Sequence, residues 1–170
     1  MLARRGGRKA LFEDGSGMSQ PRKVSDEVIM AEAIRLVGEG ISVTFPVKGR
    51  SMLPFIVGGR DSVILEKPAE IRKGNVVLAH VESENREGKH YVVHRVISLN
   101  GERVTLMGDG NLALHEFCNR SEVFAKITWV VKPNGKKRSL DSFFYRLFSK
   151  VWSALLPFRR YLLWIYNKVN

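Results

Sequence analysis

Three side chains in the sequence have the types that nucleophilic catalysis requires. Ser51 lies in the segment VKGRSMLPFI, His94 in the apolar run YVVHRVISL, and Asp109 between two glycines in LMGDGN. A serine nucleophile needs a base that accepts its proton and a third group that orients this base. A serine, a histidine and an aspartate can fill these roles together, so the chemistry to consider is acyl transfer through Ser51.

Ordinary structural interpretations of the same residues remain open. A serine before Met-Leu-Pro can simply form a turn, and a lone histidine on the apolar face of a strand is more often a packing residue. An acid between two glycines usually marks a tight turn. The other strand-region histidines are weaker candidates, because His80 ends an apolar run and His90 falls in the charged segment 82–90, which we predict to be a solvated hairpin loop. The occurrence of all three motifs in one chain favours catalysis.

Short β-rich runs separated by turns must position these residues. The runs cover residues 42–47, 62–66, 75–81, 91–99, 103–108 and 123–131. Period-2 alternation places His94 on the same strand face as Val92 and Val96, and Asn100-Gly101 between two runs is a strong hairpin signal. This pattern predicts a mostly β fold, a partly open antiparallel β-barrel-like domain with helices on either side of it in the chain.

An N-terminal helix precedes the strands. Apolar residues recur at near-helical spacing from residue 24 to residue 38, Ser25 is a suitable N-cap, and Gly38 and Gly40 end the helix. We therefore divide the chain into a disordered basic extension (1–23), a β domain (24–131), a linker (132–138) and a basic amphipathic helical tail (139–170).

Charge is distributed unevenly over these parts. The chain of 170 residues carries a net charge of +11, of which +4 falls in 1–23 and +8 in 132–170, so the β domain is nearly neutral. Basic tails favour anionic partners, either lipid head groups or nucleic acid. The N-terminal segment lacks the apolar run of a signal peptide, and Met18 is an alternative start. The single cysteine, Cys118, excludes an intramolecular disulfide framework and a cysteine-rich zinc site.

The C-terminal tail has a helical apolar stripe. Its members are Phe144, Leu147, Phe148, Val151, Trp152, Leu155 and Leu156. Such a helix can pack on its own domain or on a partner, or it can lie on an anionic membrane, because Trp, Tyr and Phe accompany Lys and Arg. A membrane span is not expected, since Arg159 and Arg160 interrupt the apolar run. We expect a cytoplasmic protein, either free or peripheral on the inner face of the membrane.

The order of the motifs resembles that of the S24/S26 serine peptidases, and within them the type I signal peptidases. The resemblance runs from about Val43 to Asn111 through GRSMLPFI, GGRDSVIL, IRKGNVVLAHV, YVVHRVISL and VTLMGDGN. A histidine where the commoner bacterial branch has lysine is similar to the archaeal and endoplasmic-reticulum forms. The resemblance implies that Ser51 is the nucleophile, His94 the general base and Asp109 the orienting acid.

The resemblance extends to residues around these three. Met52 and Pro54 match residues that shape the nucleophile turn and a pocket for small substrate side chains, and Asp61 matches a structural acid. Asn111 completes the GDGN motif and is taken as a supporting residue.

Three features depart from the family pattern. Gly49 stands where the family often has a hydroxyl for the oxyanion hole, so we expect backbone N–H groups, including that of Ser51, to serve instead. A further aspartate is replaced by the segment LALHE, in which His115 and Glu116 are the candidates to fill its role. The usual N-terminal transmembrane helix is not evident.

We therefore predict a serine endopeptidase that cleaves extended peptides or precursor proteins after small residues, with no cofactor and no metal. The alternative is a non-catalytic or self-cleaving regulatory protein of the same fold that binds DNA or a protein partner. Nucleic acid is the less favoured partner, because the segment before the β domain is too short for a helix-turn-helix domain. The sequence makes no prediction of the oligomeric state.

Overall fold

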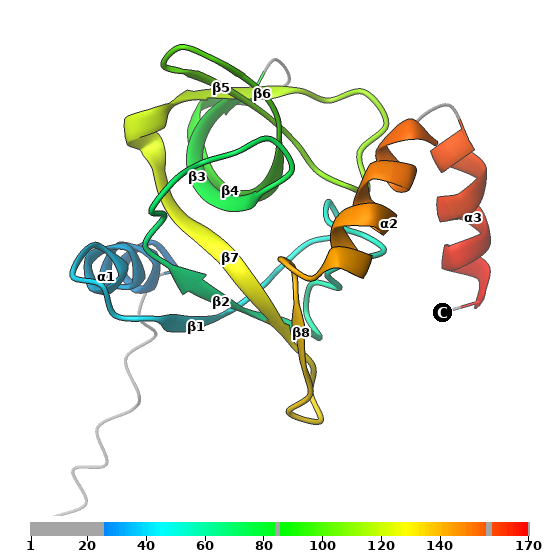
Figure 1. The fold of residues 1–170 in the computed structure, drawn as a ribbon, viewed down its shortest axis with the longest axis horizontal. Helices are drawn as coiled ribbons and strands as arrows, with labels where there is room; N and C mark the ends of the chain where they lie inside the picture. The colour runs from blue at the N-terminus through cyan, green and yellow to red at the C-terminus, as the bar shows by residue number, and fades with distance from the viewer. Residues whose placement is uncertain (1–25, 84–85, 156–157, 170) are drawn as a thin grey trace, which may run out of the picture.

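The structure, a computed structural model, describes residues 26–83, 86–155 and 158–169. The predicted extension 1–23, the N-cap Ser25 and Leu156 lie outside the described residues. The elements in chain order are α1 (Asp26–Gly38), β1 (Val43–Pro46), β2 (Ser62–Glu66), β3 (Val76–Ser83), β4 (Arg86–Asn100), β5 (Arg103–Met107), β6 (Glu116–Asn119), a 3-10 turn (Arg120–Glu122), β7 (Val123–Val131), β8 (Lys137–Ser139), α2 (Phe143–Ala154) and α3 (Arg159–Val169) (Figure 1).

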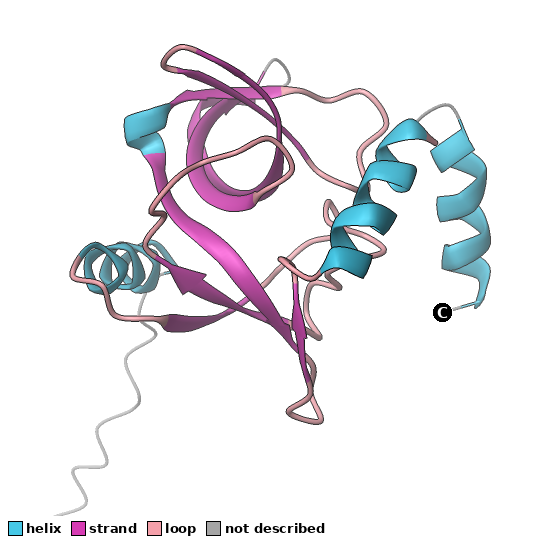
Figure 2. Cartoon of the chain, viewed as in Figure 1, coloured by secondary structure: helices cyan, strands magenta, loops and turns pink. Residues whose placement is uncertain are grey.

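The strands form one antiparallel sheet that curls into a partial ring. Their order is β1-β2-β7-β3-β4-β5-β6, and β8 pairs with β7. The last strand, β6, also pairs with β3 through Glu82 and Phe117, which bends β3 to β6 around on themselves (Figure 2). Because β1 stays at the open end of this order, the ring is not a closed barrel. The prediction of a mostly β, partly open antiparallel fold with an N-terminal helix and C-terminal helices is confirmed.

Two connecting segments contain more strand than the sequence predicts. Most of the predicted loop 82–90 is strand, since β3 continues to Ser83 and β4 begins at Arg86, so His90 lies on β4 opposite Val81. The predicted linker 132–138 is a hairpin, in which Gly135 has a positive φ of 77° and donates its N–H to the carbonyl of Lys132. In the described parts of both segments, most charged side chains are exposed while the strands stay paired, so a charge-rich run does not by itself indicate a loop.

Two apolar clusters hold the fold together. One lies between α1, the strands β2 and β7, and the C-terminal helices, and it includes Val37, Ile56, Ile127 and Trp152. The other lies inside the ring of β3 to β6. Full burial of one large apolar side chain stabilises a fold by roughly 1.5–3 kcal/mol, so Trp152 fixes α2 firmly on the β domain. The C-terminal helices are thus attached to the β domain on the side away from α1 (Figure 1).

Candidate active site

Ser51 lies at the start of a tight turn after β1. The next residues form one helical turn, in which the N–H groups of Phe55 and Ile56 both donate to the carbonyl of Met52 at 3.0 Å. The side chains of these three residues are buried in the core, whereas Ser51 is only partly buried. The apolar residues after the serine therefore anchor the turn and leave Ser51 facing outward.

The GDGN motif packs directly against the backbone of this turn. The N–H of Gly110 donates to the carbonyl oxygen of Ser51 at 2.7 Å. A Cβ atom at Gly108 would lie 2.4 Å from that same oxygen, and one at Gly110 would lie 2.7 Å from the carbonyl oxygen of Arg50. Only glycine allows such an approach, so both glycines are needed to bring this loop to Ser51.

Ser51 and His94 line the same apolar cavity. Its volume is about 290 Å³, and the rest of its wall comes from α1, β1 and the two residues after it, β3 and β4, including Ile29, Met30, Phe45, Val47, Leu78 and Val92. The described residues show no hydrogen bond between the Ser51 hydroxyl and His94, and such contacts commonly tighten only when substrate binds. Within the described part of the chain, the backbone N–H of Ser51 has no hydrogen-bond acceptor.

The partner of His94 is Glu116. The Nδ1 atom of His94 is hydrogen-bonded to one carboxylate oxygen of Glu116, the first residue of β6, and both side chains are almost completely buried. The other oxygen of Glu116 lies 3.6 Å from Nε2 of His90. With Nδ1 occupied by a carboxylate, the Nε2 atom of His94 is the nitrogen left to accept a proton.

Asp109 does not take this position, contrary to the sequence prediction. Both of its carboxylate oxygens accept hydrogen bonds from the guanidinium of Arg95, at 2.8 and 2.6 Å. Successive side chains of a strand point to opposite faces, so His94 and Arg95 leave β4 on opposite sides. Asp109 lies on the side of Arg95, away from the His94 imidazole. Burial alone would lower the pKa of Arg95, but hydrogen bonds and the charge of Asp109 raise this pKa above its ordinary value.

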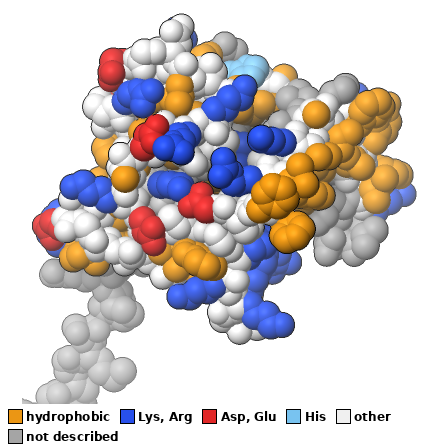
Figure 3. Space-filling view, in the orientation of Figure 1, with side chains coloured by type: hydrophobic (Ala, Val, Ile, Leu, Met, Phe, Trp, Pro, Cys, Tyr) orange, Lys and Arg blue, Asp and Glu red, His pale blue; other side chains and the backbone are white. Residues whose placement is uncertain are grey.

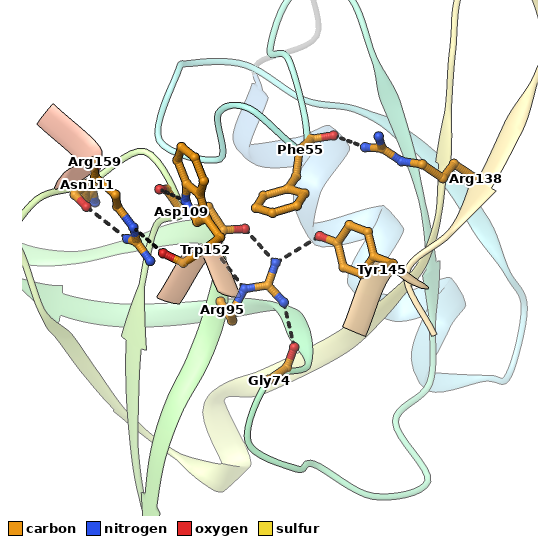
Figure 4. Close-up of polar contacts among 9 residues, drawn as sticks. All are labelled: Phe55, Gly74, Arg95, Asp109, Asn111, Arg138, Tyr145, Trp152 and Arg159. Carbon is orange, nitrogen blue, oxygen red and sulfur yellow. Dashed lines mark hydrogen bonds and ion pairs between the residues drawn. The ribbon is translucent and has the colours of Figure 1, made fainter. Parts of the chain in front are cut away.

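The C-terminal helices reach the same loop from outside (Figure 4). Trp152 on α2 donates its indole N–H to the carbonyl of Asp109 at 2.9 Å, and Arg95 donates to the Tyr145 hydroxyl at 2.9 Å. Arg159 on α3 donates to the carbonyl of Asn111 at 3.3 Å. Burial raises the pKa of the Tyr145 hydroxyl above its ordinary value. The hydroxyl therefore accepts the Arg95 hydrogen bond in its neutral form. Packing of the tail helix on its own domain is one of the two alternatives that the sequence leaves open, but its contacts with the GDGN loop have no sequence signal.

The remaining predicted site residues do not line the cavity. Met52 is buried in the core, and Pro54 follows a cis peptide bond in the turn. Neither belongs to the cavity wall. His115 is exposed, so of the two candidates in LALHE only Glu116 approaches His94.

Gly49 and Asp61 shape the start and end of the nucleophile loop. Gly49 has a φ of +83°, a conformation that side-chain-bearing residues rarely adopt, which explains the missing hydroxyl at this position. The buried carboxylate of Asp61 accepts hydrogen bonds from Arg60, Lys132 and the N–H of Val57. Burial would raise the pKa of Asp61, but these hydrogen bonds together hold it below its usual value.

Other chemistry has little support among the described residues. Burial of Cys118 raises the pKa of its thiol to about 11, so the nucleophilic thiolate is scarce at neutral pH. In residues 26–83, 86–155 and 158–169, no group of three His, Cys, Asp or Glu side chains is placed to hold a metal ion. No helix in these same ranges is long and apolar enough to cross a membrane.

Comparison with known proteins adds no family assignment. No protein-family model matches the chain, and neither a curated protein nor a solved structure matches it.

Proposed function

We propose that the protein is a serine endopeptidase similar to the S24/S26 signal peptidases, with Ser51 as nucleophile, His94 as general base and Glu116 as the group that orients the base. The observation that carries this proposal is the buried contact between His94 Nδ1 and Glu116 beside the cavity that Ser51 lines. Serine peptidases on unrelated folds pair a buried imidazole with a buried carboxylate in this way and use the second ring nitrogen to accept the proton of the serine hydroxyl.

The reaction follows from these positions. The Ser51 hydroxyl oxygen attacks the scissile carbonyl carbon while Nε2 of His94 takes the hydroxyl proton, and Glu116 stabilises the imidazolium that forms. His94 then gives this proton to the departing amine as the C–N bond breaks, which leaves an acyl-enzyme. A water molecule, deprotonated by the same imidazole, attacks the ester, and the released Ser51 oxygen takes the proton back from His94.

The oxyanion of the tetrahedral intermediate needs hydrogen-bond donors. Gly49 offers no side-chain hydroxyl, so the N–H of Ser51, which no described group accepts, is the natural donor. A missing second donor lowers a peptidase rate by roughly 10²–10³-fold. We therefore expect a slow enzyme unless the substrate completes this hole.

The cavity suits an extended peptide. The strand β1 is at the open end of the sheet and supplies Phe45 and Pro46 to the cavity wall, so a peptide can add beside it as a further strand. The apolar wall favours uncharged side chains, and preference for small residues at the cut is what the resemblance to signal peptidases implies.

A peptide-library cleavage screen tests the proposal. Mass spectrometry of the products identifies cleaved sequences, and Ser51→Ala and His94→Ala should each lower cleavage by roughly 10⁴-fold or more. Ser98→Ala and His115→Ala remove exposed residues of the same types and should cleave as the wild type does. Near-wild-type cleavage by Ser51→Ala, with its thermal unfolding unchanged, would refute the assignment.

A further inference from the structure

The apolar stripe that the sequence places along α2 is mostly the exposed face of this helix. Phe144 is 81% exposed and Phe143 74%, and Leu147 and Val151 are also exposed. The residues that hold α2 on the β domain are Tyr145, Ser149 and Trp152 on its other side. On α3, Tyr161 and Trp164 are exposed as well. We call this surface the α2–α3 face. It includes the exposed side chains of Phe143, Phe144, Leu147, Val151, Tyr161 and Trp164.

A basic cavity borders the α2–α3 face. It has a volume of about 400 Å³ and lies between α2 and the segment before β3, with six Lys and Arg side chains and two carboxylates in its wall. Both carboxylates are already paired, Glu70 with Arg72 and Asp141 with Lys126. Arg95 is paired with Asp109. An uncompensated positive charge therefore remains in this cavity.

That charge comes from Lys73, Arg146 and Lys150. Within the described residues, no carboxylate lies at ion-pair distance from any of the three. Arg146 and Lys150 are one helical turn apart on α2, and with Phe143 and Leu147 they also line an adjoining hollow of about 390 Å³. Basic and apolar side chains thus meet along one edge of α2. Figure 3 shows the same arrangement, with Lys and Arg gathered over the middle of the molecule beside the hydrophobic side chains of α2 and α3.

We propose that the α2–α3 face and its basic cavity form a docking site for a membrane of anionic phospholipids. The aromatic and aliphatic side chains would enter the acyl boundary, and Lys73, Arg146 and Lys150 would bind phosphate groups at the level of the lipid head groups. Trp164 and Tyr161 are residue types that prefer this interface, and Lys168 lies 4.4 Å over the Trp164 ring, next to the same surface.

Charge argues for lipid over the other occupants. The helices α2 and α3 contain five Lys and Arg and no Asp or Glu, so two copies brought together on this face would repel each other. Nucleic acid would use the basic cavity but would leave the exposed Phe and Leu side chains in water. An anionic bilayer satisfies both parts of the surface at once. This inference does not depend on peptidase activity.

Vesicle co-sedimentation of the full chain tests it. The vesicles are phosphatidylcholine alone and phosphatidylcholine mixed with an equal amount of phosphatidylglycerol. We expect strong binding to the mixture, weak binding to phosphatidylcholine, and release from the mixture at high salt, because surface charge is then screened. Equal binding to both vesicles, or none to either, would overturn the proposal.

Matched variants assign the binding to this face. Each basic side chain near an anionic surface contributes a factor of roughly five in affinity, so Lys150→Glu should weaken binding roughly 5- to 30-fold. Arg103→Glu makes the same charge change at the first residue of β5, whereas the GDGN loop that contacts α2 follows the last residue of this strand. This control should have little effect. The double variant Phe144→Ser, Leu147→Ser should weaken binding roughly tenfold or more. Equal effects of Lys150→Glu and Arg103→Glu would mean that net charge alone attracts the protein, which contradicts a built site.

Two further measurements separate the rival occupants. Mobility shift with duplex DNA should show only weak binding, and DNA binding that survives the Phe144→Ser, Leu147→Ser change without any vesicle binding would assign the cavity to nucleic acid. Sedimentation of the wild-type protein without vesicles should show no dimer that is lost in the Phe144→Ser, Leu147→Ser variant. Such a dimer, without vesicle binding, would assign the face to a second copy of the chain.

Discussion

Asp109 and Glu116 are two carboxylates at the ends of one loop, and they bind different partners. Each is only 2% exposed. The sequence predicts Asp109 as the orienting acid of His94 and Glu116 only as a candidate replacement for a further aspartate of the family pattern. Asp109 forms a two-bond ion pair with Arg95, which also donates to the Gly74 carbonyl and the Tyr145 hydroxyl. Glu116 faces an imidazole instead.

The difference comes from strand geometry. His94 and Arg95 are neighbours on β4, so their side chains leave opposite faces of the sheet. The carboxylate on the arginine side is balanced by a permanent charge, and through Arg95 it links the GDGN loop to Tyr145 on α2. The carboxylate on the histidine side meets a group that can gain and lose a proton. Both positions hold an equally buried carboxylate, and the facing group decides its role.

Of the changes to the two carboxylates, Glu116→Gln has the largest expected effect on activity. An amide can present its NH₂ to Nδ1 and so stabilise the wrong tautomer, and we expect kcat/KM for a library-derived peptide to fall by roughly 10³–10⁴-fold. Thermal unfolding should change little, because shape and volume are kept. Glu82→Gln is the exposed control on β3. A fall of less than tenfold for Glu116→Gln would return the orienting role to another group.

Asp109→Ala should affect stability more than any catalytic step. It leaves the buried Arg95 guanidinium without its charged partner, and breaking a buried ion pair in this way costs about 3–5 kcal/mol. Urea unfolding measures this loss. Adding Arg95→Met should recover part of it, because the unpaired charge is then removed. If Asp109→Ala abolished cleavage while unfolding stayed at the wild-type midpoint, the division of roles between the two carboxylates would be wrong.

Local patterns in the sequence predicted the helices and all the described strands except β6 and β8. Alternation and the Asn100-Gly101 turn are properties of neighbouring residues, and the structure confirms them. The short strand β6 was missed, because four residues with two polar side chains carry almost no period. The contact of Glu116 with His94 depends on how β6 pairs with β3 and β5, and such long-range pairing leaves no local signal.

The tail shows the same limit from another side. Its helical period was visible, but α2 has apolar residues on two faces, and periodicity alone does not say which of them meets the protein. Trp152 belongs to the buried side although it also fits the predicted stripe, and Phe144 faces water. The adjacent pair His94-Arg95 was visible too. The sequence does not show that His94 pairs with one carboxylate and Arg95 with the other, because this depends on which segment packs against each face of β4.

Gly108→Ala tests how the Asp109 loop serves the nucleophile. The new Cβ would approach the carbonyl oxygen of Ser51 to 2.4 Å, and because the obstacle is backbone, the two loops must move apart. We expect a destabilisation of about 1–3 kcal/mol, as for overpacking in a core, with a clear loss of cleavage at temperatures where the variant is folded. Gly101→Ala is the control at a hairpin with open space around it, although its positive φ adds some strain. Full cleavage by folded Gly108→Ala would show that Ser51 tolerates displacement of the loop.

The smallest effect concerns the third buried carboxylate, Asp61, which resembles Asp109 in having cationic partners. Its folded-state pKa is lowered, so the stability that it contributes is fully present above its unfolded pKa, near 3.8, and is lost as the pH falls through the lower folded value. Asp61→Asn should therefore be less stable than the wild type at neutral pH, by about 1–3 kcal/mol for hydrogen bonds to a charged group. The gap between the two urea midpoints should narrow as the pH falls below about 4. A gap independent of pH would mean that shape, and not the charge on Asp61, holds Lys132 and Arg60 in place.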